Sequence, residues 1–291
     1  MWLALSCIAG ALVLELAARV LVPPRTGLGP AFGPDSRPGV VYSPRQGESS
    51  IGGWESADRW AARIDAQGAR VTPAGDEGCP RVVVYGDSYP FGWGVSDGEA
   101  YPALLGAPLE SRIGCRPTVE NRGVPGYHLG QSLARMQADG AHKAAVVVLH
   151  VEPFDGFPDF DFTSPLPLPR PLVARSRLLW IAQAAAIQRF DESIVKDAER
   201  TAAQTAVLHE RLKALADWRN RDGTTVVLVV EPEVEEPTRR RLLAIGPSVN
   251  TERCDSEGDR LPENRHLSAA GHRCLADVLA PILAPLLADG P

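Results

Sequence analysis

A serine follows the first strongly apolar run of the chain. Arg81–Tyr85 reads RVVVY, a β-branched run typical of a strand buried on both faces, and Gly86, Asp87 and Ser88 come directly after it. A serine at the carboxyl edge of a parallel sheet stands where open α/β sheets bind ligands, and its own N–H can face a developing oxyanion. Asp87 or Ser88 could equally act as a plain helix N-cap. Gly-Asp-Ser alone therefore does not establish a nucleophile.

A histidine with an acid ahead of it lies far along the chain. Glu263 precedes His266 by three residues, so its carboxylate can accept the Nδ1–H and leave Nε2 free to take a proton from a serine hydroxyl. Ser268 is the natural N-cap of the helix that follows. A lone loop histidine is more often a solvent-facing polar residue, so the pair matters only if folding brings it to Ser88.

The elements between these loops alternate in type. Strands are predicted at Arg81–Tyr85, Pro117–Glu120, Ala144–His150 and Thr224–Val230. Helices are predicted at Tyr101–Leu109, Leu129–Ala138, about 176–219 with a break near Phe190–Asp191, and Ala269–Leu287. Such alternation predicts an α/β domain with a parallel sheet and helices on both faces.

With these loops in this order, the sequence resembles the SGNH (GDSL-type) hydrolase family. Residues 86–95 look like its first conserved block, 121–127 (NRGVPGY) like the second, and 263–272 like the last. The resemblance covers about residues 80–285. It implies a flavodoxin-like three-layer α/β/α fold built on a parallel sheet.

The resemblance also implies roles for individual residues. Ser88 would be the nucleophile and His266 the general base, with Glu263 orienting His266 where the family usually has Asp. The backbone N–H groups of Ser88 and Gly126 would form the oxyanion hole. Gly126 suits this role because a residue without Cβ lets the backbone approach a reacting carbonyl.

The loop after the third strand departs from the family pattern. The family has Gly-x-Asn-Asp or Gly-x-x-x-Asn-Asp here, and the Asn completes the oxyanion hole. With the longer spacing, Phe154 occupies the position of the family's Asn, Asp155 that of its Asp, and His150 that of its Gly. Losing one oxyanion donor costs on the order of 10²–10³ in rate. The alternatives are a slow enzyme, a substitute donor such as His150 or His128, and a domain that binds without catalysis.

A Pro-rich stretch follows that loop. Residues 154–171 hold four Phe and five Pro, and we interpret them as a lid or acceptor-binding wall, with a packed structural loop equally compatible. The substrate-binding candidates are Asp87, Tyr89, Phe91, Trp93, Asn121, Phe154 and Asp155. Aromatic faces suit sugar rings, although core packing is their default role.

Composition excludes several classes of protein. The 291 residues carry a net charge of −6 without a basic block, which argues against nucleic acid as a partner. A metal site is not expected either, because the acidic and histidine side chains of the third loop match no known ligand spacing and are better explained as a solvated loop. They are His150, Glu152, Asp155, Asp159 and Asp161. No cofactor is expected.

The N-terminus predicts a membrane segment. Residues 2–22 are apolar except for Ser6, Glu15 and Arg19, and as a helix they just span a hydrocarbon core of about 30 Å. We therefore expect an uncleaved anchor at 1–24, a linker with some irregular structure at 25–78, and the hydrolase-like domain at 79–291 with a long helical insertion at about 172–220. An apolar helix docked on the domain is the alternative.

Two signals disagree about which side of the membrane the domain occupies. Arg19 near the end of the segment, with Arg25 and Arg37 after it, favours the cytoplasm, whereas an even set of four cysteines beyond it suits an oxidising compartment. We favour the extracytoplasmic side.

The resemblance makes the cysteines testable. In this family the first two strands are parallel neighbours, so their starts share an edge, which predicts a disulfide between Cys79 and Cys115. Cys254 and Cys274 would then form the second pair. Free buried thiols are the alternative for all four.

Together these features predict a membrane-anchored SGNH-type esterase or O-acyltransferase that acts on an acylated glycan or lipid through an acyl-enzyme. The main alternative is a non-catalytic glycan-binding or assembly module that keeps the fold and has lost the Asn at Phe154. A cytosolic lipase-like enzyme with a docked N-terminal helix is a third possibility.

Overall fold

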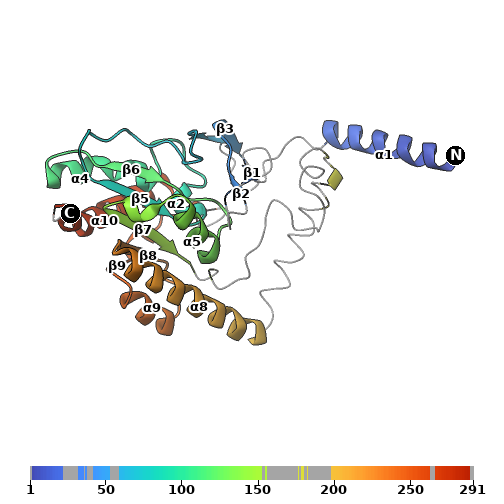
Figure 1. The fold of residues 1–291 in the computed structure, drawn as a ribbon. Helices are drawn as coiled ribbons and strands as arrows, with labels where there is room; N and C mark the ends of the chain where they lie inside the picture. The colour runs from blue at the N-terminus through green and yellow to red at the C-terminus, as the bar shows by residue number, and fades with distance from the viewer. Residues whose placement is uncertain are drawn as a thin grey trace.

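A five-stranded parallel sheet forms the centre of the molecule (Figure 1). The computed structural model describes residues 2–21, 32–35, 37, 42–52, 59–152, 155, 176, 178–179, 182, 198–262 and 266–288. The strand order is β6-β5-β7-β8-β9, with β5 at Arg81–Tyr85, β6 at Thr118–Asn121, β7 at Val146–Val151, β8 at Thr225–Val230 and β9 at Ser248–Asn250. This is the flavodoxin-like order, and it places β5 and β7 side by side at the centre.

Alternate residues of the strands bury opposite faces of the sheet. Val82, Val84 and Val146 pack into one apolar cluster, and Val83 and Val147 into the other. The first face is covered by α3 (Tyr101–Leu104), α4 (Gly106–Ile113) and α10 (Ala269–Ala288). The second is covered by α5 (Leu129–Ala138), α8 (Ala198–Asp222) and α9 (Glu236–Leu243). The result is the three-layer α/β/α arrangement expected from the sequence.

Among the described residues, α10 is the helix that is long and apolar enough to cross a membrane. Its Leu275, Leu279 and Leu283 are fully buried in the cluster beneath the first face of the sheet. We therefore assign α10 to the core of the domain. The N-terminal segment forms a helix as well, α1 (Trp2–Leu21).

The segment expected to be a linker is folded where the structure describes it. Two hairpins occupy it, β1 (Phe32–Pro34) with β2 (Tyr42–Pro44), and β3 (Gly47–Gly52) with β4 (Arg59–Ile64). Their apolar side chains form a third buried cluster together with Phe91, Val124 and Tyr127 of the main domain. The linker prediction for 25–78 is therefore wrong over these strands, because alternating Trp60, Ala62 and Ile64 bury one face of β4.

The predicted strands agree with β5, β6, β7 and β8 to within two residues at each end. The sequence missed β9 and α9, which are short. The long helical span is represented by α8, whereas its expected break near Phe190–Asp191 and most of the insertion at 172–220 lie outside the described residues.

Both expected disulfides are present. Cys79 and Cys115 join the starts of β5 and β6, with Cα atoms 6.2 Å apart. Cys254 and Cys274 join the short helix η3 (Thr251–Cys254) to α10, with Cα atoms 5.7 Å apart. The free-thiol alternative is thereby overturned.

Candidate active site

Ser88 begins the short helix α2 (Ser88–Phe91), which follows β5 at the carboxyl edge of the sheet. The turn between them needs a glycine: Gly86 has a φ of +141°, and a Cβ there would come within 2.9 Å of the Cβ of His150. Asp87 is the N-cap, since its Oδ1 accepts a hydrogen bond from the Tyr89 N–H at 2.9 Å. This turn presents the Ser88 side chain at the edge where β5 and β7 end.

The Ser88 hydroxyl meets a histidine from the far end of the chain. Its Oγ lies 2.7 Å from Nε2 of His266, although 178 residues separate the two in sequence. The same Oγ lies 3.1 Å from Oδ2 of Asp87. A serine hydroxyl in hydrogen-bond contact with an imidazole is the arrangement required for general-base activation of a nucleophile.

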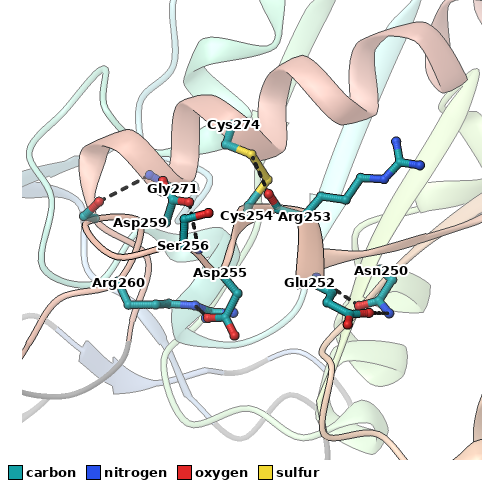
Figure 2. The surroundings of a disulfide bond; sticks show 11 residues. Asn250, Glu252, Arg253, Cys254, Asp255, Ser256, Asp259, Arg260, Gly271 and Cys274 are labelled. Carbon is teal, nitrogen blue, oxygen red and sulfur yellow. Dashed lines mark hydrogen bonds and ion pairs between the residues drawn. A yellow bond between two sulfur atoms is a disulfide. The ribbon is translucent and has the colours of Figure 1, made fainter.

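Several contacts outside the helices hold the His266 loop. The Leu261 N–H donates to the His266 carbonyl at 2.7 Å, and Arg260 forms ion pairs with Glu231 at 2.9 Å and with Asp255 at 2.8 Å. Figure 2 shows Arg260 reaching Asp255 beside the Cys254–Cys274 disulfide, which ties this loop to α10. Glu263, the residue expected to orient His266, lies outside the described residues.

Two aromatic side chains flank the imidazole. The Tyr89 ring centroid is 5.1 Å from that of His266, and the Trp93 centroid is 6.5 Å from it. The guanidinium carbon of Arg260 lies over the Tyr89 ring, 5.4 Å from the ring centroid. Both aromatic residues are half-buried, so the sequence-predicted candidates Tyr89 and Trp93 do lie beside the Ser88–His266 pair.

The backbone groups expected to form an oxyanion hole come from neighbouring loops. The Val124 N–H donates to the Gly86 carbonyl at 2.9 Å, which binds the 121–127 loop to the loop that carries Ser88. Gly126 has a φ of +79°, a conformation that favours glycine. Among the contacts of the described residues, neither the Ser88 nor the Gly126 N–H donates a hydrogen bond.

His150, one of the two suggested substitute oxyanion donors, pairs with an acid through one of its ring nitrogens. Its side chain is buried between the rings of Tyr89 and Tyr101, whose centroids are 5.2 and 6.2 Å from that of His150, and its Nε2 lies 2.8 Å from Oε1 of Glu231. Burial opposes ionisation of Glu231, but the hydrogen bond from His150 and the charge of Arg260 outweigh it and lower the pKa of Glu231 to about 2. Because a carboxylate only accepts hydrogen bonds, Nε2 of His150 carries a proton and is committed to Glu231. Its Nδ1 is buried and has no hydrogen-bond partner among the described residues, so the substitute-donor role stays a prediction.

His128, the other suggested substitute, lies just before α5 and is buried. Burial, followed by the charge of Arg211, lowers the pKa of His128 to about 4, so this imidazole is neutral at pH 7.

Three expected substrate-binding residues have structural roles instead. Phe91 is fully buried in the third apolar cluster. Asn121 is buried, and its Nδ2 donates to the Pro90 carbonyl at 2.7 Å while its Oδ1 accepts from the Gly123 N–H. Asp155 is buried, and its Oδ2 accepts from the Glu152 N–H at 2.7 Å. Because Tyr89 and Trp93 do lie beside the site, the sequence alone did not show which of the nearby side chains are buried. Phe154 lies outside the described residues.

Two buried acids, Glu152 and Asp155, follow β7. Burial raises the pKa of Glu152 well above its ordinary value, and the charge of Asp87 and a hydrogen bond with it add to this effect. Burial likewise raises the pKa of Asp155 to about 7, against the opposing hydrogen bond from the Glu152 N–H. Within the described part of the chain, no three His, Cys, Asp or Glu side chains converge as metal ligands; Asp159 and Asp161 lie outside it.

Arg70 is a residue of the site that the sequence did not reveal. Its Nη1 donates to the carbonyls of Phe91 and Gly92 at 2.7 and 2.6 Å, and its Nη2 to that of Val95 at 2.7 Å. Its Nε faces Asp97 at 3.3 Å. These carbonyls lie three to seven residues after Ser88, so Arg70 fixes the turn that follows Ser88 in the chain. The apolar residues at every second position, Trp60, Ala62 and Ile64, were the available sequence signal that this segment packs against the domain.

Comparison with known proteins finds relatives by structure alone. No protein-family model matches the chain, and no curated protein matches it in sequence. The chain is similar in structure to a G-D-S-L family protein from Desulfitobacterium hafniense, with 14% identity, a TM-score of 0.43, and coverage of 70% of this chain and 99% of that one. TesA gives 19% identity, a TM-score of 0.43, and coverage of 71% and 99%.

A catalytic mutant of Axe2, an acetylxylan esterase from Geobacillus stearothermophilus, gives 17% identity, a TM-score of 0.44, and coverage of 70% and 94%. These similarities are too distant to transfer a substrate or a mechanism.

Proposed function

We propose that the protein is a serine ester hydrolase of SGNH type, with Ser88 as nucleophile and His266 as general base. The observation that carries the proposal is the 2.7 Å contact between Ser88 Oγ and His266 Nε2 at the carboxyl edge of the sheet. A module that only binds glycans has no need for this contact. The two residues in contact, Ser88 and His266, belong to the Gly-Asp-Ser and His-Leu-Ser motifs of the family that the sequence resembles.

The proposed reaction uses groups already in place. His266 Nε2 takes the hydroxyl proton as Ser88 Oγ attacks the ester carbonyl, and the backbone N–H groups of Ser88 and Gly126 stabilise the resulting oxyanion. Collapse of the intermediate breaks the bond to the alcohol, which leaves with the proton from His266. Water, activated by the same imidazole, then releases the acid from Ser88; a sugar hydroxyl in its place would make the enzyme an acyltransferase.

We further propose an acylated glycan or lipid as the substrate. The half-buried rings of Tyr89 and Trp93 flank His266 and offer apolar faces that suit a sugar ring or an acyl chain.

We also propose that α1 anchors the protein in a membrane and that the domain lies on the extracytoplasmic side. The described side chains of α1 include Leu12, Val13, Leu14, Leu16 and Val20, which are 60–72% exposed, a pattern that favours a lipid environment. The only charges on this part of the helix, Glu15 and Arg19, pair with each other at 2.8 Å. The two disulfides support an oxidising compartment. Protease digestion of sealed, right-side-out membrane vesicles tests the orientation. An extracytoplasmic domain should be digested, and a domain that is protected inside the vesicles would contradict the proposal.

The catalytic proposal is tested with the full chain in detergent and a short-chain p-nitrophenyl ester. We expect turnover by the wild type and a loss of at least 10³-fold in kcat for both Ser88→Ala and His266→Ala, because each removes a member of the nucleophile–base pair. Ser111→Ala, an exposed serine on α4, is the control. No turnover by a folded wild type, or equal turnover by wild type and Ser88→Ala, would leave the non-catalytic module as the better explanation.

A further inference from the structure

Glu15 makes contacts that an isolated membrane helix would not have. Its Oε1 accepts a hydrogen bond from Arg19 on the same helix at 2.8 Å. Its Oε2 accepts from the Ser176 hydroxyl at 2.9 Å and from the Leu178 N–H at 3.1 Å, although 161 and 163 positions separate these partners from it in sequence. The described part of the insertion after β7, the short yellow segment in Figure 1, therefore lies beside α1.

The contact with Glu15 is made by the beginning of a helical turn. Leu178, Leu179 and Ala182 are helical, and the Leu179 N–H donates to Ser176 Oγ at 3.2 Å, which is the hydrogen bond of a helix N-cap. The first N–H groups of a helix have no partner within it, and leaving them unsatisfied is costly in a membrane. Glu15 accepts one of these N–H groups, and its negative charge suits this end of a helix.

Glu15 lies within the apolar length of α1. Leu21 ends the helix six residues later, so at 1.5 Å per residue Glu15 is about 9 Å from this end. Leu12 and Leu16 beside it are 65% exposed, whereas the Glu15 side chain is 19% exposed and Ala18 is 7% exposed. One stripe of α1 is therefore covered by other residues of the chain while the rest faces outward, as in a membrane helix that packs against a neighbour.

The sequence that follows Ser176 suits a lipid environment. Residues 178–187 read LLWIAQAAAI, apolar except for Gln183, and arginines stand on both sides at 177 and 189. An apolar run with a tryptophan and flanking arginines is typical of segments that lie at a membrane interface. At the described positions, Leu178 and Leu179 are half-buried and Ala182 is exposed, so these residues are not part of the core of the domain.

Resting on the membrane anchor proposed above, we propose that residues 176–182 form a second contact of the protein with the lipid bilayer, docked on α1 through Glu15. The charged carboxylate is tolerated there because both of its oxygens accept hydrogen bonds. Residues 152–175 connect this contact to the end of β7, at the edge of the sheet where Ser88 lies. The insertion thus links the catalytic edge of the domain to the membrane.

The test uses the full-length Cys7→Ser protein in phosphatidylcholine vesicles, since the other four cysteines are held in disulfides. One new cysteine at a time carries the fluorophore NBD: Ala182→Cys in the segment, Leu16→Cys on the exposed face of α1, or Ser111→Cys on the exposed surface of α4. Nitroxide-labelled lipids quench a fluorophore only where it lies in the bilayer. We expect quenching at positions 16 and 182 and none at position 111.

Two substitutions of Glu15 test the docking. Glu15→Leu keeps α1 apolar but removes the acceptor, so the first N–H groups of the second helix lose their partner and quenching at position 182 should fall about twofold or more. Quenching at position 16 should not change. Glu15→Gln is the matched control, because its amide oxygen can still accept from Ser176 and Leu178, and it should keep the quenching at position 182.

The proposal is overturned if the label at position 182 is not quenched while the label at position 16 is, or if Glu15→Leu and Glu15→Gln give the same quenching at position 182. Absence of quenching at both positions would overturn the membrane anchor as well, so the two failures are distinguishable. Thermal unfolding identifies variants that fail to fold.

Discussion

The two halves of the catalytic pair are held by different means. The Ser88 loop is fixed from within, because buried Arg70 and Asn121 donate hydrogen bonds to the carbonyls that follow it. The His266 loop is fixed by the Cys254–Cys274 disulfide and by the ion pairs of Arg260. One half therefore depends on the packed interior, and the other on links that redox conditions and pH can alter.

This difference separates stability from activity. Contacts around Ser88 also join the N-terminal hairpins to the main domain, so their loss should unfold the protein as well as misplace the serine. Contacts around His266 hold a loop over an already assembled sheet, so their loss can lower activity more than stability. Three changes test this contrast.

Arg70→Met should have the largest effect. The Arg70 side chain is 1% exposed, and its removal leaves three carbonyl groups of the turn after Ser88 without their donor. Breaking such a buried charged network costs about 3–5 kcal/mol, which urea unfolding would measure. Arg63→Met is the control: this side chain pairs with the same Asp97 but is 58% exposed, and should cost less than about 1 kcal/mol. Equal losses would refute the interior role of Arg70.

Removing each disulfide in turn should give similar losses of stability but different losses of activity. The Cys residues are separated by 36 positions in one pair and 20 in the other, for which loop-closure entropy gives about 4 and about 3 kcal/mol. Cys254→Ala/Cys274→Ala should also lower kcat at least tenfold, because this bond closes the segment that carries His266. Cys79→Ala/Cys115→Ala, at the amino end of the sheet, should leave kcat within about twofold. Measurements are made where both variants remain folded, and the idea fails if both retain full kcat.

Arg260→Gln should have the smallest effect on stability, about 1.5 kcal/mol at pH 7. Ionised Glu231 has a pKa of about 2 in the folded protein, below its ordinary value, so its contribution is complete above about pH 4.5 and is lost as the pH falls toward 2. Without Arg260 the pKa of Glu231 is less depressed, so this loss should be smaller and should be complete at a higher pH. Urea unfolding between pH 2 and 7 measures the shift. Arg240→Gln, in an exposed pair with Glu236, should show none.

The sequence predicted the parts of the molecule that local patterns encode. The RVVVY strand, the following serine and the Leu129–Ala138 helix needed only apolar runs and turn residues, and the family motif joined His266 to Ser88. It failed where roles depend on distant packing. Phe91 and Asn121 adjoin the site in sequence yet face the interior, and Arg70 lies in a segment expected to be a linker.

Glu152 was missed for a related reason. The sequence comparison placed the expected donor position on Phe154, using the longer spacing, and Glu152 looked like part of a solvated acidic loop. In the folded chain Glu152 is buried at the end of β7, which pairs with the strand β5 that leads to Ser88. A register of this kind joins residues more than sixty positions apart, and no local pattern encodes it.

The position of α10 in the core bears on how the chain matures during synthesis. This helix is translated after all five strands, and its Leu275, Leu279 and Leu283 complete the apolar layer on one face of the sheet. A nascent chain that has released the strands but not α10 therefore carries Ser88 on a half-covered sheet, without the disulfide partner Cys274. We therefore expect the Ser88–His266 pair to be held in place only once α10 has docked, and prematurely terminated chains to expose an apolar face to chaperones and proteases.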